Sequence, residues 1–270
     1  SGRSDPRAGR HRRSSGQRHV GVEKGTGKRV HELFDLVCGT STGGILAMAV
    51  GVHNHSLDRC DEIYRDLGQQ IFSKPRTSEQ EKESSWRDRL DNLYTSAGTG
   101  VQQAWRMGWH LSKHDASLFE SLVRQECRLP TPEDPRGDCE LSFVDAGLLG
   151  GPKVFVVSTL VSVIPATPFL FRNYEYPEEM MDDDGYGVHD AVPGSCKHRL
   201  WQGVRASSAA PYYLADYVHG SDKWQDGAVT CNNPAMLGVM EARRLWPDRP
   251  IDCVVSLGSG VFERRSRDAS

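Results

Sequence analysis

Ser41 is the residue of this 270-residue sequence whose surroundings point most directly to chemistry. It lies in the segment Gly39, Thr40, Ser41, Thr42, Gly43, which has the pattern Gly-x-Ser-x-Gly. An apolar, strand-like run precedes the pattern, and an apolar, helix-like run follows it. A sharp strand-to-helix turn strains the serine backbone and exposes its hydroxyl, while the helix N-terminus favours developing negative charge. The pattern predicts a nucleophilic serine, with a tight turn lacking any chemistry as the alternative.

A serine hydroxyl needs a general base before it becomes an effective nucleophile. In an ordinary α/β-hydrolase this base is a histidine that follows the acidic residue late in the chain. The late histidines here lie in or beside irregular polar segments and turns: His189, His198 and His219. We interpret them as exposed or incidentally hydrogen-bonded residues rather than as members of a catalytic triad.

A second candidate base is the carboxylate of Asp226. Together with Gly227 and Ala228 it forms an Asp-Gly-Ala segment, in a predicted loop that leads to a helix capped by Asn233. A carboxylate at this place can take the serine proton directly, which would make a two-residue Ser–Asp site. An Asp-Gly pair is equally typical of a plain turn, so the residues alone leave both interpretations open.

Composition describes a soluble globular protein of 30.0 kDa, with 37% hydrophobic and 26% charged residues and a length that suits one domain. The net charge of −3 conceals an asymmetry, because residues 1–30 hold nine Lys/Arg and only two Asp/Glu. Residues 1–27 are nearly free of apolar side chains. They predict a disordered, solvated basic tail, with contact to nucleic acid or anionic lipid as the alternative, and they lack the apolar core of a signal peptide.

The seven cysteines are widely spaced, and no pair has the spacing of zinc ligands. They predict free thiols in a reducing, intracellular compartment and no structural metal. The longest largely apolar run, residues 154–164, is too short to span a bilayer. We therefore expect any membrane contact to be peripheral.

Strand-like apolar runs alternate with helical patterns along the chain, which favours an α/β fold with a mainly parallel sheet covered on both faces. The predicted strands are residues 33–38, 153–163 and 251–258. The predicted helices are residues 42–50, 56–72, 116–127, 198–210 and 233–246. Ser56 and Asn233 suit the N-cap positions of two of these helices.

Five blocks of this sequence, in order, resemble those of patatin-like phospholipases: FDLVCGTSTGGILA, RASSAAPYYLADY, WQDGA, NNPAMLGVMEARRLWP and VVSLGSG. The resemblance covers residues 28–260, and within the family it is nearest to the gamma-type calcium-independent branch. It implies a three-layer α/β/α fold and calcium-independent hydrolysis of the fatty acyl esters of glycerophospholipids. It also implies that Ser41 is the nucleophile and Asp226 the proton acceptor, with no metal and no other cofactor.

The resemblance further implies a phospholipid membrane surface as the partner, no nucleic acid, and peripheral association with a mitochondrial, peroxisomal or endoplasmic reticulum membrane. Oligomeric state does not follow from it. We expect residues 28–260 to form the acyl hydrolase domain, between the basic tail of residues 1–27 and a polar tail of residues 261–270.

One family feature has no counterpart here, namely the glycine-rich oxyanion loop, Asp-Gly-Gly-Gly-x-Arg-Gly, that precedes the nucleophile. Residues 24–29 resemble it superficially, but we interpret them as a turn or flexible linker, and their glycine spacing is also wrong for a phosphate-binding loop. The backbone N–H of Thr42 would remain as one oxyanion donor. The domain is therefore expected to be N-terminally incomplete. The alternative function is an impaired, patatin-fold protein that binds lipid or a partner without catalysis.

Overall fold

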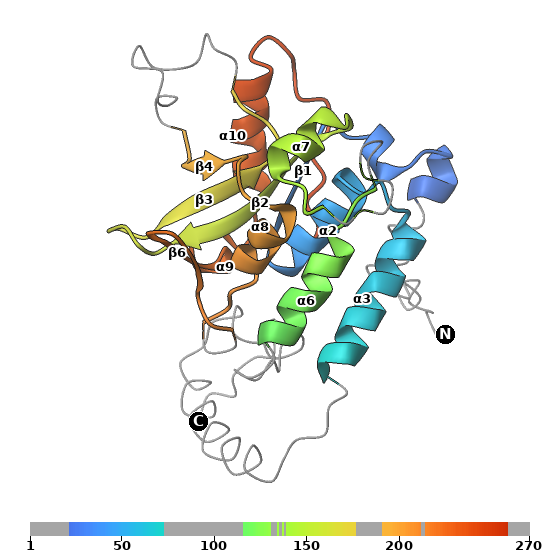
Figure 1. Ribbon diagram of the computed structural model, residues 1–270. Helices are drawn as coiled ribbons and strands as arrows, with labels where there is room; N and C mark the ends of the chain where they lie inside the picture. Colours follow the sequence, from blue (N-terminus) through green and yellow to red (C-terminus); the bar gives the residue numbers. More distant parts are fainter. Residues whose placement is uncertain are drawn as a thin grey trace, which may run out of the picture.

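The computed structural model describes residues 22–72, 116–130, 134, 137, 139–176, 191–211 and 214–258 (Figure 1). Its strands are β1 (Leu36–Thr40), β2 (Lys153–Leu160), β3 (Thr167–Arg172), β4 (Gly194–Ser195), β5 (Tyr217–His219) and β6 (Asp222–Asp226). Its helices include α2 (Thr42–Gly51), α3 (Leu57–Phe72), α6 (Ala116–Glu126), α7 (Phe143–Leu148), α8 (Leu200–Ser207), α9 (Ala228–Cys231) and α10 (Ala235–Leu245), with a 3-10 turn η1 (Val30–Glu32). The predicted tails lie outside the described residues, except for residues 22–27.

The sheet is organised around β2, with the strand order β4-β3-β2-β6-β5 and β1 also paired with β2. β1 pairs in parallel with residues 153–157 of β2, and β6 pairs antiparallel with residues 158–160. Because β3 pairs with residues 155–160, it must occupy the opposite edge of β2. β1 and β6 therefore meet end to end along one edge of β2.

The α/β class is confirmed, but the described sheet is mixed rather than mainly parallel. β1–β2 and β3–β4 are parallel pairs, whereas β2–β3, β2–β6 and β5–β6 are antiparallel. The connections explain the difference. Only residues 161–166 separate β2 from β3, and a parallel return needs a crossover of a dozen or more residues.

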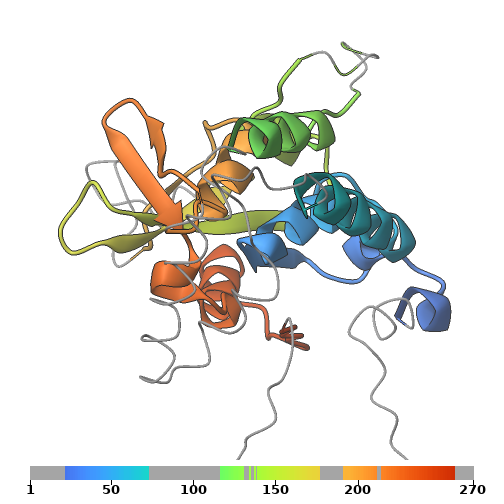
Figure 2. The same ribbon diagram turned by 90° about the horizontal axis from the view of Figure 1, so that it is seen from below.

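Helices cover both faces of the sheet, as Figure 2 shows, with α10 on one face and α2, α6 and α8 on the other. Successive side chains of β2 point to opposite faces. Val154 and Val156 belong to the core cluster that includes residues of α2, α6 and α8, whereas Phe155 and Val157 pack in the cluster that includes Leu237 of α10. The three-layer arrangement explains why β2 is apolar throughout instead of alternating.

Hydrogen bonds confirm the predicted cap of α3, whereas the N-cap of α10 differs from the prediction by one residue. The Arg59 N–H donates to Ser56 Oγ at 3.1 Å, which makes Ser56 the side-chain cap of α3. The Ala235 N–H donates to Asn233 Oδ1 at 3.0 Å, although Pro234 rather than Asn233 occupies the N-cap position of α10.

The prediction of a final buried strand at residues 251–258 is wrong. This segment belongs to no strand, and Val254, Val255 and Leu257 are 55%, 53% and 66% exposed. A strand needs a neighbour that satisfies its backbone groups. Within the described residues β1 pairs only with β2, and none of the strands pairs with residues 251–258. Apolar composition alone therefore does not make this run a strand.

The prediction of a turn or flexible linker at residues 24–29 is partly wrong, because residues 22–26 form a helical turn. The turn ends at Gly27, whose φ of +69° is the left-handed conformation common after a helix C-terminus. The Glu23 side chain accepts hydrogen bonds from the N–H groups of Val30 and Leu57. Through these hydrogen bonds, residues 22–30 contact the start of α3.

Candidate active site

Ser41 occupies the sharp turn between β1 and α2, with φ 57° and ψ −121°. A positive φ is strained for any residue with a Cβ, and such strain gathers at functional sites. Ser41 is the N-cap residue of α2, yet its side chain makes no capping hydrogen bond. The hydroxyl is therefore not used to stabilise the helix and remains available for another purpose.

The two glycines that flank Ser41 in the motif are not equivalent. A Cβ at Gly39 would overlap the carbonyl group of Gly43, so β1 and α2 approach too closely for any side chain there. A Cβ at Gly43 would meet no atom within 4 Å. The turn therefore requires glycine at position 39, and its packing does not require glycine at position 43.

The variants Gly39→Ala and Gly43→Ala should differ in their effect on stability. Gly39→Ala is expected to lower the free energy of unfolding by about 3 kcal/mol, since the overlap forces the backbone apart. Gly43→Ala should change it by less than about 1 kcal/mol, because the new methyl group lies in open space and alanine favours a helix. Urea unfolding followed by circular dichroism measures both, and equal losses would contradict this account of the turn.

Asp226 ends β6 opposite Ser158 of β2, one position beyond the Thr40–Val157 pair that ends β1. The end-to-end meeting of β1 and β6 thus brings Asp226 to the turn that holds Ser41. Ser41 and Asp226 are far apart in the sequence. Their approach follows from the parallel pairing of one strand and the antiparallel pairing of the other.

The Asp226 side chain is fully buried. Its Oδ1 accepts a hydrogen bond from the Ala228 N–H at 2.8 Å, whereas Oδ2 has no hydrogen-bond partner. Burial raises the pKa of Asp226 to about 7, while the hydrogen bond from the Ala228 N–H and the nearby Ser41 hydroxyl oppose that rise. The Ser41 hydroxyl is close enough to lower this pKa, but it forms no hydrogen bond to Oδ2. In unliganded sites such contacts are often long.

The other motif residues join the two halves of the site. A Cβ at Gly227 would overlap the Val157 carbonyl and would approach the Thr40 methyl group, so only glycine fits between β2 and the end of β1. Thr40 Oγ1 donates to the carbonyl of Cys231 at 3.0 Å. Thr40 and Gly227 thus hold α9, and with it the Asp226 segment, against the Ser41 turn.

Thr42 is the first residue of α2, so its backbone N–H has no partner within the helix. The Thr42 carbonyl accepts a hydrogen bond from the Tyr64 hydroxyl at 2.8 Å, which ties the turn to α3. Burial raises the pKa of Tyr64 to about 12, so this hydroxyl keeps its proton at neutral pH. The Thr42 N–H follows Ser41 directly in the chain, at the N-terminus of α2.

Residues 24–29 lie away from this donor. Val30, which follows them, packs against the cluster of Ala49, Val50 and Cys60 at the C-terminal end of α2. Ser41 is at the other end of that helix, about 15 Å away for ten residues at 1.5 Å each.

The described late histidines lie elsewhere. The rings of His198 and His219 are 5.6 Å apart, and His198 packs edge-on against Phe169, Phe171 and Trp224. Burial lowers the pKa of His198, so it stays neutral among these rings. His189 lies outside the described residues. Neither described histidine is hydrogen-bonded to Asp226 or Ser41.

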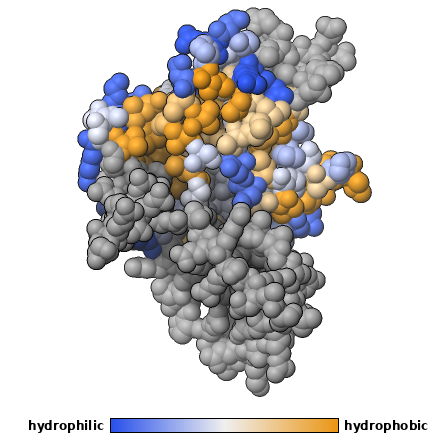
Figure 3. Space-filling view, turned by 180° about the vertical axis from the view of Figure 1, so that it is seen from behind, coloured by the Kyte–Doolittle hydropathy of each residue, from blue (hydrophilic) through white to orange (hydrophobic). Residues whose placement is uncertain are grey.

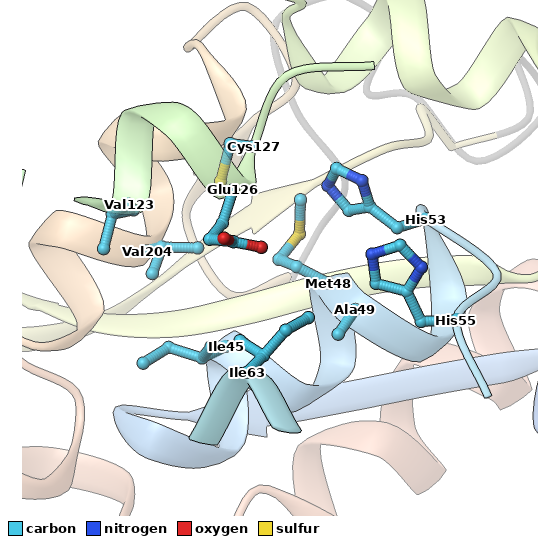
Figure 4. Close-up of a pocket in the computed structure, with 10 residues that line it drawn as sticks. All are labelled: Ile45, Met48, Ala49, His53, His55, Ile63, Val123, Glu126, Cys127 and Val204. Atoms are coloured by element: carbon cyan, nitrogen blue, oxygen red, sulfur yellow. The ribbon is translucent and has the colours of Figure 1, made fainter. Parts of the chain in front are cut away.

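A small cavity lies between α2, α3, α6 and α8, and Figure 4 shows the side chains around it. It is lined by residues of four helices and the loop after α2: Ile45, Met48, Ala49, His53, His55, Ile63, Val123, Glu126, Cys127 and Val204. Its volume of about 30 Å³ holds one or two water molecules at most, far less than a fatty acyl chain. Burial lowers the pKa of His53 to about 4, so its ring is neutral.

The expectations from sequence also include the cysteines and the possible metal ligands. None of the seven cysteines forms a disulfide. Across the described ranges, no group of three or more His, Cys, Asp or Glu side chains is arranged to hold a metal ion. The site thus consists of a strained serine, a buried carboxylate and a helix N-terminus.

A family model described as "Patatin-like phospholipase" matches residues 16–239. The chain belongs to this family of proteins. It is 47% identical over 267 residues to "Phospholipase A I" of Arabidopsis thaliana. This alignment covers 91% of this chain and 19% of that protein. It is 35% identical over 245 residues to human "Calcium-independent phospholipase A2-gamma", with 90% of this chain and 26% of that protein covered.

These comparisons refine the expectation from sequence. The patatin-like family is confirmed, and both the plant phospholipase and the gamma form of calcium-independent phospholipase A2 are similar to this chain, at 47% and 35% identity. The chain spans about a fifth to a quarter of the length of these relatives. A more distant relative is the "85/88 kDa calcium-independent phospholipase A2" of Mus musculus, 25% identical over 253 residues.

Proposed function

We propose that this chain hydrolyses fatty acyl ester bonds of glycerophospholipids through a Ser41–Asp226 dyad, without calcium. The observation that carries the proposal is the pairing of a strained serine hydroxyl, free of any capping bond, with a buried carboxylate whose pKa lies near 7. A general base works best when its pKa is close to the operating pH. The relatives are named as phospholipases, and one of them as calcium-independent, which supports the same substrate class.

In the proposed reaction, Asp226 accepts the proton of the Ser41 hydroxyl while Oγ attacks the carbonyl carbon of the ester. The carbonyl oxygen becomes an oxyanion beside the Thr42 N–H and the N-terminus of α2, which stabilise negative charge. When the tetrahedral intermediate collapses, the proton on Asp226 passes to the departing lysophospholipid oxygen and the acyl group stays on Ser41. Water, deprotonated by Asp226, then attacks this acyl ester and releases the fatty acid as Ser41 recovers its proton.

A phospholipid surface is the proposed partner, and apolar surface near the site supports it. On the face turned away in Figure 1, apolar side chains gather over the described part of the chain (Figure 3). Val229, three residues after Asp226, is 51% exposed, and Met236 at the start of α10 is 69% exposed. None of the described helices combines the length and the apolar character that crossing a bilayer needs. We propose peripheral contact with a membrane, such as that of mitochondria, peroxisomes or the endoplasmic reticulum.

Calcium removal provides a direct test. Vesicles of phosphatidylcholine should release fatty acid at the same rate in EDTA and in millimolar calcium, because no step of the proposed reaction uses a cation. Ser41→Ala in the same assay sets the background. Activity that disappears in EDTA and returns with calcium would overturn the calcium-independent dyad. Vesicle binding without hydrolysis above the Ser41→Ala background would instead identify a lipid-binding protein.

A further inference from the structure

A short segment at the end of α8 contacts both halves of the proposed dyad through hydrogen bonds. The Ser41 N–H donates to Ser207 Oγ at 2.7 Å. The Asp226 N–H donates to the Ala209 carbonyl at 2.8 Å, and the Gly227 N–H donates to the Ser207 carbonyl at 3.2 Å. Ser207 and Ala209 therefore form hydrogen bonds to the segments of the nucleophile and the base, which come from elements far apart in the sequence.

The Ser207 hydroxyl has a defined orientation. The side chain is fully buried, and its O–H donates to the Val157 carbonyl. A hydroxyl has one proton, so this bond leaves only the oxygen lone pairs to face Ser41. Val157 lies in β2, the central buried strand, and is itself fully buried. The acceptor for the Ser41 N–H is thus anchored to the most enclosed strand of the sheet.

This acceptor matters because the Ser41 backbone is held at a positive φ. A conformation of that kind costs of order 1–3 kcal/mol and persists only where surrounding contacts enforce it. The hydrogen bond to Ser207 is such a contact, and it also satisfies a buried N–H that would otherwise have no acceptor in the turn. Without it, the turn can relax and carry the Ser41 hydroxyl away from Asp226.

We propose that Ser207 is a positioning residue that holds the Ser41 nucleophile in its strained conformation; this inference rests on the proposed function. Ser208 provides the internal comparison. It follows Ser207 directly and is equally enclosed, with 1% of its surface exposed, but its hydroxyl has no hydrogen-bond partner. Two adjacent buried serines thus differ in whether they contact the nucleophile.

The test compares Ser207→Ala with Ser208→Ala on a soluble short-chain ester, with Ser41→Ala as background. A misplacement of about 1 Å costs roughly a hundredfold in rate, so Ser207→Ala should lower kcat by about 10- to 100-fold. KM should stay within about twofold, because substrate contacts are unchanged. Ser208→Ala should keep kcat within about threefold of the wild type, as no contact to the dyad is lost.

A second variant covers the case in which Ser207→Ala does not fold. Ser207→Cys fills nearly the same volume, but sulfur is a weak acceptor, so a folded Ser207→Cys protein should show the same loss of kcat. Thermal unfolding by circular dichroism verifies that each variant is folded. An unchanged kcat in either folded Ser207 variant, or a rise in KM alone, would overturn the positioning function.

The rate at which a fluorophosphonate probe labels Ser41 keeps this inference separate from the proposed function. Failure of the wild type to hydrolyse any ester above Ser41→Ala would reject the proposed function. Slower labelling of Ser207→Ala than of Ser208→Ala would then still support positioning of a reactive serine. Equal labelling rates, or no labelling of the wild type, would reject the positioning of Ser41 as well.

Discussion

Ser41→Ala should reduce phospholipid hydrolysis to background, a loss of about 10⁴- to 10⁶-fold, as expected when a nucleophile that works together with its base is removed. The change removes the only atom that forms the covalent bond in the proposed reaction. The fold should be retained, because the Ser41 hydroxyl makes no capping bond and its backbone N–H still reaches Ser207. Fatty acid release from phosphatidylcholine vesicles in EDTA measures the loss.

A matched serine variant controls for non-specific effects. Ser121 lies exposed on α6, where its hydroxyl donates to the Leu118 carbonyl. Ser121→Ala should keep the full rate of hydrolysis. Residual activity of Ser41→Ala near the level of Ser121→Ala would mean that another group is the nucleophile, and the dyad would have to be abandoned.

Asp226→Asn should combine a large loss of activity with a gain in stability. Asparagine cannot accept the Ser41 proton, so hydrolysis should fall by about 10³- to 10⁴-fold, the loss typical of disabling the acidic partner of a serine nucleophile. The folded protein at pH 8 holds a buried carboxylate whose Oδ2 has no hydrogen-bond partner. Replacing it with a neutral amide should raise the free energy of unfolding by on the order of 2 kcal/mol.

The pH dependence of this stability gain follows from the raised pKa. Burial holds the pKa of Asp226 at about 7 in the folded state, above the ordinary value of 3.8. The folded state therefore binds the proton more tightly, and the stabilisation it gains is complete below pH 3.8 and lost as the pH rises through 7. The difference in free energy of unfolding between Asp226→Asn and the wild type should therefore grow from pH 3.8 to pH 7 and level off above pH 7. If this difference in stability stayed constant from pH 4 to pH 8, the raised pKa of Asp226 would be contradicted.

The activity should rise with pH as Asp226 loses its proton, whereas the stability of the wild type falls. Asp226 accepts a proton only when ionised, so the wild-type kcat/KM on a soluble ester should rise with pH and reach half its maximum near pH 7. Asp252→Asn, at an exposed carboxylate, should leave the profile unchanged. A half-maximum near pH 4 would mean that the base is a solvated carboxylate and not Asp226.

Local sequence determined those features that depend on neighbours in the chain. Ser41 could be recognised because a strand, a glycine-bounded turn and a helix follow one another within residues 36–51. Ser56 could be recognised as a cap for the same reason. Asp226 was different. Its own surroundings are compatible with a plain turn, and only the likeness of five ordered blocks to a family singled it out.

Tertiary structure decided everything that depends on pairing between distant segments. The run at residues 251–258 is apolar enough for a strand, yet no described strand pairs with it. Gly39 and Gly43 look alike in the motif, but only Gly39 faces an atom that excludes a side chain. These outcomes depend on which backbone groups lie opposite each other, and no periodicity along a single segment records that.

The same distinction applies to the site as a whole. The sequence alone predicts a nucleophilic serine after a strand, and the family resemblance predicts a carboxylate base 185 positions later. Only the tertiary structure brought Thr40 and Asp226 to adjacent positions along β2 and placed Ser207 against the Ser41 N–H. The physical reason is that hydrogen bonds between separate elements form once the sheet and its covering helices have packed.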